Sequence, residues 1–190
     1  MTISNALGYA FMIALPPAVD QNLRRWTEAT PGASWDVSGG HVTLARFTGN
    51  LAAQKLVPAL HEACAGFGAF DVRFSVPARE AYWDKPGLEI VMLIGERPHD
   101  VAGVVDLRER LIASLLPMGL ALMESGSYRP HVTLTTGLPP VEALALEAAA
   151  AGLELRFTAH EVVLWAGGEP AEDGAPAGPP WRAIERLLLL

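Results

Sequence analysis

Two histidines, each followed two residues later by a threonine, are the residues of this sequence best suited to chemistry. The motif HVTL occupies residues 41–44 and recurs unchanged at residues 131–134. An imidazole can take up and release a proton near neutral pH, and a threonine hydroxyl beside it can donate a hydrogen bond to a phosphate oxygen. Two such pairs that face each other could open a phosphodiester without a metal, one histidine acting as base and the other as acid.

Each motif stands where an extended strand is expected to begin. Successive side chains of a strand point to opposite faces, so His41 and Thr43 share one face while Val42 and Leu44 share the other. The second copy alternates in the same way. Either copy alone is an ordinary strand sequence, because short motifs often match by chance. The functional interpretation therefore depends on whether the surroundings of the motifs repeat.

The surroundings do repeat. Residues 8–83 and 88–165 both read as strand, helix, His-x-Thr strand, helix, strand and a strand that ends in tryptophan. A duplication predicts two similar lobes related by a pseudo-twofold axis, which would place the two His-Thr faces on either side of a cleft. We interpret residues 1–190 as one bilobal domain with a tail, residues 166–190, whose end returns as a closing strand.

The elements that position the motifs follow from hydrophobic periodicity and from proline and glycine. Helices are expected at residues 18–30, 51–65, 98–116 and 141–151. The second of them should kink, or begin near Val57, because Pro58 lies within it. Further strands are expected at residues 8–15, 70–76, 80–83, 88–94 and 155–158.

Composition limits the classes of function. A formal net charge of −7 does not suit a protein that grips long nucleic acid through many phosphates. Cys64 is the single cysteine, so an internal disulfide is excluded. The apolar run at residues 6–15 has no basic residue before it, as a signal peptide would, and no run reaches the roughly 20 residues of a membrane helix. We expect a cytoplasmic monomer that binds neither a membrane nor a long duplex.

Other hydrolytic sites fit less well. Zinc and two-metal hydrolases need three or more close ligands, and no acidic residue recurs in register with the motifs. A Gly-x-Ser-x-Gly motif, a P-loop and a Rossmann fingerprint are absent from the sequence. We therefore predict no metal and no cofactor. His61, His99 and His160 are out of register with the motifs and are interpreted as structural or solvated.

The paired motifs lie 90 residues apart, and the second follows the aromatic-x-Pro sequence of residues 128–130. In these features the chain resembles the two-histidine (2H) phosphoesterase superfamily, and within it the bacterial RNA 2',3'-cyclic phosphodiesterases, historically named 2'-5' RNA ligases. The resemblance covers residues 8 to about 165. It implies an α+β, duplicated bilobal fold in which two antiparallel-rich sheets line a central cleft, with helices outside.

The resemblance also implies an activity and its residues. The activity is metal-independent opening of the 2',3'-cyclic phosphate of an RNA end or nucleotide to a 2'-phosphate, with reversible 2'-5' RNA joining in some members. It implies that His41 and His131 are the acid–base pair and that Thr43 and Thr133 hold the phosphate. Related alternatives are hydrolysis of other small cyclic phosphates or of 2'-5' linkages. Alternatives of another class are a nucleotide or RNA-end binding module without turnover and a purely structural repeat.

Contacts beyond the reacting phosphate are less well defined. Members of the group often carry a basic residue shortly after the second motif, whereas Thr135 and Thr136 stand there in this chain and Arg46 occupies such a place after the first motif. Tyr128 and Arg129 adjoin the second motif and are candidates to bind substrate.

Aromatic residues of the strands give further candidates. Phe11 shares a face with Tyr9 and could stack on a base, although strand aromatics are more often buried. Trp83 and Trp165 recur in equivalent places, which favours core packing for both.

Overall fold

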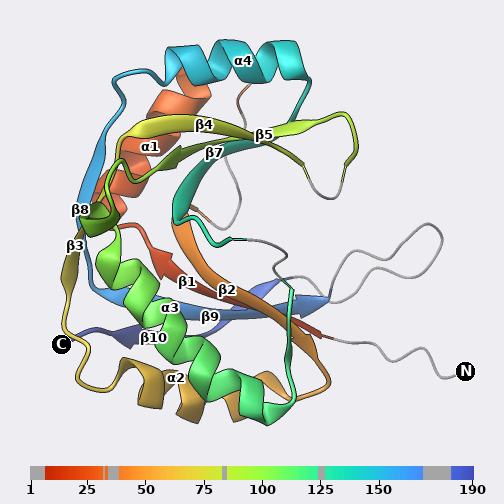
Figure 1. The fold of residues 1–190 in the computed structure, drawn as a ribbon, viewed down its shortest axis with the longest axis vertical. Coiled ribbons are helices and arrows are strands. Elements are labelled where there is room, and N and C mark those ends of the chain that lie inside the picture. Colours follow the sequence, from red (N-terminus) through yellow and green to blue (C-terminus); the bar gives the residue numbers. More distant parts are fainter. Residues whose placement is uncertain (1–6, 32, 34–38, 83–84, 124–126, 169–180) are drawn as a thin grey trace, which may run out of the picture.

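The structure is a computed structural model that describes residues 7–31, 33, 39–82, 85–123, 127–168 and 181–190 (Figure 1). In the first half of the chain the elements are β1 (Leu7–Ala14), α1 (Pro17–Ala29), β2 (His41–Gly49), α2 (Val57–Cys64), β3 (Phe70–Phe74) and β4 (Val76–Ala81). In the second half they are β5 (Glu89–Ile94), α3 (Ala102–Leu115), β6 (Ala121–Leu122), β7 (His131–Leu138), α4 (Pro140–Ala149), β8 (Leu155–Ala159), β9 (Glu161–Gly168) and β10 (Arg182–Leu188).

Most expected elements are present, and the differences have local causes. Helix α2 begins at Val57, after a 3-10 helix at Ala53–Leu56, because Pro58 suits a first helical turn and not a helix interior. The chain leaves β3, which pairs with β8, and joins β5 as β4 directly after Ser75. The strand expected at residues 80–83 therefore starts earlier, and Trp83 lies outside the described residues.

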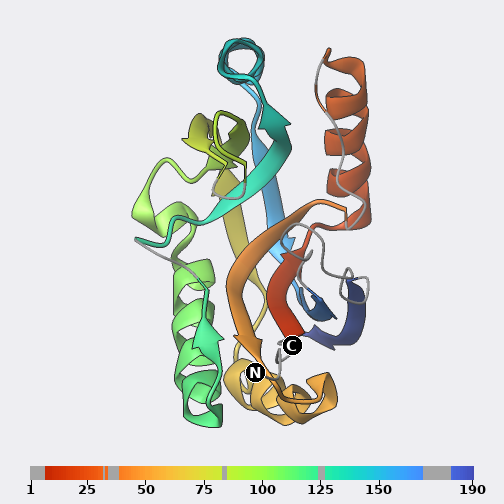
Figure 2. The same cartoon turned by 90° about the vertical axis from the view of Figure 1, so that its right-hand side faces the viewer.

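Antiparallel pairing organises the strands into one large sheet and one small one. The large sheet has the order β10-β9-β1-β2-β7-β5-β4, with β6 added to β2, and β3 pairs with β8 in the small one. Among the described residues, one pair, Val42 with Val132, joins β2 to β7. The large sheet thus consists of two half-sheets that meet at the motif strands. Figure 1 shows β2 continuing the curve of β7 through the middle of the molecule, and Figure 2 shows the two strands approaching each other there.

Helices lie outside this sheet. Figure 1 shows α1 and α4 at one end of the molecule and α2 and α3 at the other. Together with the antiparallel pairing, this arrangement confirms the expected α+β class. The strand order is symmetric about the β2–β7 contact when β1, β2 and β9 are exchanged for β5, β7 and β4. That symmetry supports the proposal of a duplicated chain. No helix in the described part of the chain is long and apolar enough to cross a membrane.

Helix α3 shows how the core holds a motif strand in place. Its buried residues recur every three or four positions and form one apolar stripe: Val104, Leu107, Leu111 and Leu115. The helix contacts both α2 and β2. On β2 the motif residues that join this core are Val42 and Leu44, both fully buried. His41 and Thr43, which alternate with them, must therefore point to the other face.

The single cysteine, Cys64, belongs to this core and allows a test of it. Burial raises the pKa of the Cys64 thiol to about 11 from an ordinary value of 9.0. Since the thiolate is the reactive form, we expect Cys64 to resist alkylation at pH 8 in the native protein and to react quickly in denaturant. Because the unfolded chain ionises first, the free energy of unfolding should also fall as the pH rises from about 9 towards 11. Equal alkylation rates with and without denaturant would show that Cys64 is not packed in this way.

Candidate functional site

Both motifs begin a strand with the same pattern of burial. His41 starts β2 and His131 starts β7. In each strand the first five residues alternate between half-buried and buried and end in two buried positions. The histidine and the threonine are half-buried, and the valine and leucine that alternate with them are buried. The predicted division into a polar and an apolar face is therefore confirmed for both copies.

The pairing of Val42 with Val132 brings the two motifs together. The two strands run antiparallel at this pair. The residues on either side of the two valines therefore lie opposite each other, His41 opposite Thr133 and Thr43 opposite His131. Side chains directly opposite each other on an antiparallel pair have Cβ atoms about 4.5–5.5 Å apart. Because both valines point into the core, the two histidines and two threonines lie on the other face, next to one another.

A β-bulge in β2 extends this polar face. Three residues of β2, His41, Thr43 and Arg46, stand opposite alternate residues of β1, which are Ala14, Met12 and Ala10. Strand β1 pairs with β9 without any irregularity, so the extra residue, Leu44, belongs to β2. An extra residue shifts the alternation of side chains by one. As a result Arg46 lies on the same face as His41 and Thr43.

The same irregularity occurs at the equivalent place in β7. Met92 pairs with Thr133 and Val91 with Thr135, which leaves Leu134 as the extra residue. Leu134 and Thr135 are both buried, and Thr136 is exposed. Thr136 follows His131 by the same five positions as Arg46 follows His41. The two motif strands therefore share one backbone design but carry different chemistry at its end.

Each motif histidine is oriented by a backbone carbonyl. The Nδ1 atom of His41 lies 2.9 Å from the oxygen of Gly39, and that of His131 lies 2.9 Å from the oxygen of Arg129. A carbonyl oxygen only accepts, so in both rings Nδ1 carries the proton and Nε2 of the neutral ring is left as an acceptor. His160 makes the same kind of bond to the oxygen of Thr158, at 3.0 Å. This bond alone therefore does not mark a catalytic histidine.

Asp20, which no sequence pattern marks as functional, supports the backbone in front of His41. Its carboxylate accepts a hydrogen bond from the backbone N–H of Gly40. Gly39 has a φ of +77°, a conformation that other residues adopt at a cost, and a Cβ on Gly40 would clash with a methyl group of Leu15. Asp20 thus holds the turn whose carbonyl fixes the ring of His41. Only its place in the first turn of a helix was visible in the sequence.

Replacement of Asp20 tests this support. We expect Asp20→Ala to lower the free energy of unfolding by about 1–3 kcal/mol, because the N–H of Gly40 loses its partner. Asp20→Asn should have a smaller effect, since its amide oxygen can still accept. Chemical denaturation measures both variants. Asp106→Ala, a change on helix α3, is the comparison, and an equal loss in that variant would contradict the assigned role of Asp20.

The residues that precede the second motif tie the two motif strands together. The hydroxyl of Tyr128 donates a hydrogen bond to the backbone oxygen of Thr43 at 2.7 Å, and the guanidinium of Arg108 lies 4.2 Å from the centre of its ring. Arg129 forms an ion pair with Glu80 of β4. Tyr128 therefore helps to fix the approach to β7 against β2. That Tyr128 and Arg129 bind substrate stays a prediction.

Phe11 does not fit its expected role. Its side chain has no exposed surface, and its ring packs edge-on against that of Phe47 at a distance of 6.1 Å between centres. Tyr9 is equally buried and donates its hydroxyl to the backbone oxygen of Leu51. Both belong to the side of β1 that faces the helices. The proposed stacking of Phe11 on a base is corrected accordingly, because the ring is enclosed by the core.

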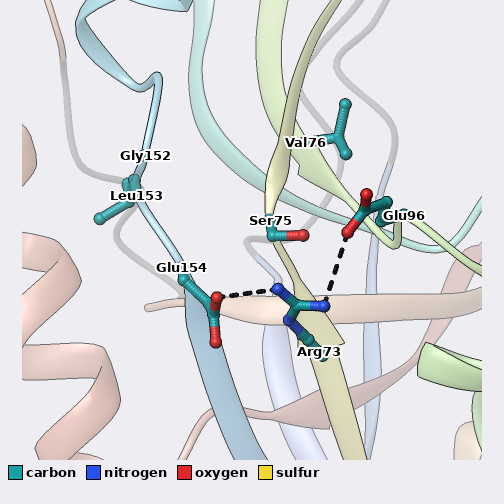
Figure 3. A pocket seen from close by; sticks show the side chains of 7 residues that line it. All are labelled: Arg73, Ser75, Val76, Glu96, Gly152, Leu153 and Glu154. Carbon is teal, nitrogen blue, oxygen red and sulfur yellow. Dashed lines mark hydrogen bonds and ion pairs between the residues drawn. The ribbon is translucent and has the colours of Figure 1, made fainter.

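A pocket at the start of β4 lies apart from the motifs. Figure 3 shows Arg73 between two carboxylates, Glu154 at 3.0 Å and Glu96 at 3.5 Å, beside Ser75. The hydrogen bond from Arg73 lowers the pKa of Glu154. None of the four motif residues lines this pocket, and its charged groups pair with each other, so we assign it to structure. Across the described residues, no three His, Cys, Asp or Glu side chains are grouped so as to hold a metal ion.

Comparison with known proteins places this geometry in a wider context. The sequence model of the 2'-5' RNA ligase superfamily matches residues 15–170. No curated protein matches the chain by sequence.

Solved structures resemble the fold over nearly its whole length. Apo LigT of E. coli has a TM-score of 0.59 and 17% identity, covering 97% of this chain and 98% of that one. E. coli LigT complexed with 3'-AMP has a TM-score of 0.61 and 18% identity over the same shares. The protein TT0787 of Thermus thermophilus has a TM-score of 0.56 and 18% identity over 97% of each chain.

Proposed function

Since this chain belongs to the 2'-5' RNA ligase superfamily, we propose that it is a metal-independent phosphodiesterase that opens the 2',3'-cyclic phosphate of an RNA end or nucleotide to a 2'-phosphate. One observation carries the proposal: the register at Val42 and Val132 sets two His-x-Thr pairs side by side on one face of the sheet. Two imidazoles and two hydroxyls around one phosphate are the groups that such a reaction requires.

The proposed reaction divides the proton transfers between the histidines. Nε2 of one ring accepts a proton from water as the water oxygen attacks phosphorus. The bond from phosphorus to the 3'-oxygen breaks, and the other histidine, which starts protonated, gives its proton to that oxygen. Thr43 and Thr133 donate hydrogen bonds to the non-bridging oxygens, where negative charge grows. The position of the substrate on the face decides which histidine is the base.

The ligands of similar proteins support a small phosphorylated substrate. The E. coli LigT structures include complexes with 3'-AMP, NADP+, ATP and phosphate. For this chain we propose a nucleotide or an RNA end as the ligand, bound by a cytoplasmic monomer. The uncharged Thr136 after the second motif favours, as a second candidate, a hydrolase of other small cyclic phosphates or of 2'-5' linkages.

A substrate panel tests the proposal. It contains 2',3'-cyclic nucleotides, RNA with a cyclic phosphate end, a 2'-5' dinucleotide and a small cyclic phosphate without a base. The leading proposal requires a 2'-phosphate product, identified by phosphorus NMR, and rates that EDTA leaves unchanged. Turnover of the other classes alone would support the second candidate. Binding without any turnover would identify a nucleotide or RNA-end binding module.

A further inference from the structure

The first half-sheet carries a row of side chains beyond the motif. Arg46 of β2 stands opposite Ala10 of β1, and Ala10 stands opposite Trp165 of β9. Residues directly opposite one another share a face of the sheet. Because Arg46 lies on the face of His41 and Thr43, Trp165 lies on that face too. It is half-buried, so the prediction that Trp165 packs in the core is only partly correct.

Trp181 reaches the same place from the edge of the sheet. It precedes β10 and lies directly over Gly167, since a Cβ built on Gly167 would come within 2.8 Å of its ring. The guanidinium carbon of Arg46 is 5.9 Å from the centre of that ring. Arg46 belongs to β2, and Trp181 directly precedes β10. These strands are separated by three strand-to-strand spacings, or about 14 Å. The two side chains can meet because the residues between them, Gly8 and Ala10, are small.

These three side chains form what we call the Arg–Trp platform: Arg46, Trp165 and Trp181. All three are half-buried, while Ala10 beneath them is 1% exposed. The sheet is thus covered by two indole rings and a cation that keep part of their own surface open. Aromatic rings and arginine in this arrangement are suited to stacking on a nucleobase.

The second half-sheet carries its pair of an aromatic ring and a cation further from the motif than the first half-sheet does. On the same face as Thr133, Met92 of β5 stands opposite it, and Ala78 of β4 stands opposite Met92. In the next row Ile90 pairs with Glu80, whose carboxylate is already paired with Arg129. One row further along, directly after β4, Tyr82 has the Nζ atom of Lys85 5.6 Å from the centre of its ring. The two rows nearest Thr133 are therefore aliphatic and acidic, whereas the row next to Thr43 carries an arginine and a tryptophan.

From this asymmetry we infer that the Arg–Trp platform is the subsite for the base of the substrate, so that the nucleoside lies over β1 and β9 and not over β5 and β4. The inference rests on the proposed function, in which Thr43 and Thr133 hold the phosphate. The residues of β1 opposite Thr43 and Arg46 are Met12 and Ala10, two positions or about 7 Å apart along the strand. A base linked through its ribose to a phosphate at Thr43 spans a gap of this size.

Binding of 2'-AMP and of inorganic phosphate, measured by calorimetry, tests the subsite without any need for turnover. We expect Trp181→Leu to weaken 2'-AMP binding about 10-fold and to leave phosphate binding unchanged, because stacking is lost and the His-Thr groups remain. Trp181→Phe should restore most of the affinity. Thr136→Ala, at the equivalent end of the second motif, is the matched control and should change neither ligand.

The outcomes separate this inference from the proposed function. Equal 2'-AMP affinity in wild type and Trp181→Leu, or wild-type protein that binds 2'-AMP no better than phosphate, would overturn the subsite. Wild-type protein that binds 2'-AMP through Trp181 yet hydrolyses no cyclic phosphate would keep the subsite and refute the enzyme. If Trp181→Leu is not folded by circular dichroism, Trp165→Leu and Arg46→Met give the same test from β9 and β2, with the same expected loss.

Discussion

Replacing His41 or His131 with alanine is expected to lower kcat for 2',3'-cyclic nucleotide hydrolysis by about 100- to 10,000-fold in each case, the range that general acid–base catalysis contributes. The two losses should not add, because the proton leaving water and the proton reaching the 3'-oxygen belong to one displacement. Both side chains are half-buried on the polar face, so their removal leaves the core untouched. Steady-state kinetics measures kcat for each variant, and far-ultraviolet circular dichroism checks that the variant is folded.

His160 is the matched control for these variants. It makes the same carbonyl bond through Nδ1 as the motif histidines, but it lies between β8 and β9 and outside the β2–β7 pair. His160→Ala should therefore keep wild-type kcat. Full activity in either motif variant would refute the assignment of the acid–base pair, and a comparable loss in His160→Ala would show that the register of β2 and β7 is not what selects the catalytic histidines.

Replacing Phe11 with alanine is expected to lower the free energy of unfolding by about 3–5 kcal/mol, which is a large part of the stability of a protein of this size. The ring is fully buried against Phe47, so its removal both exposes apolar surface and leaves a cavity. Denaturant titration followed by circular dichroism measures the change, provided the slope of the transition stays constant.

A milder change at Phe11 separates packing from ligand binding. Phe11→Leu keeps most of the apolar volume, so we expect a smaller loss of stability and an unchanged KM for a cyclic nucleotide. If instead KM rises several-fold in a variant of nearly wild-type stability, the ring contacts substrate, and its assignment to the core alone is wrong. Trp181→Leu should show the reverse behaviour, with a clear loss of nucleotide affinity and a smaller effect on the free energy of unfolding.

Local sequence patterns predicted much of this protein. The alternation of polar and apolar residues in HVTL predicted both motif strands and the face of each side chain, because a strand has a period of two wherever it lies. Proline gave the start of α2 at Val57 for an equally local reason, the loss of a backbone donor. The repeat of elements also predicted that the two motif strands would be equivalent.

The positions of the other candidates depended on pairing between distant strands. The bulge at Leu44 turns Arg46 to the polar face, and it is visible only in the register against β1. Which side of β1 is covered by helices decided that Phe11 is buried. The contact between Arg46 and Trp181 spans 135 residues of sequence and four strands of the sheet.

The sequence alone therefore determined that there are two His-x-Thr strands and which groups each offers, since these follow from residue type and the period of a strand. Only the tertiary structure decided that Val42 meets Val132, that Asp20 supports the turn before His41, and that Arg46 and Trp181 come together beside the first motif. The physical reason is that register, bulges and burial are properties of the partner strand as much as of the strand itself.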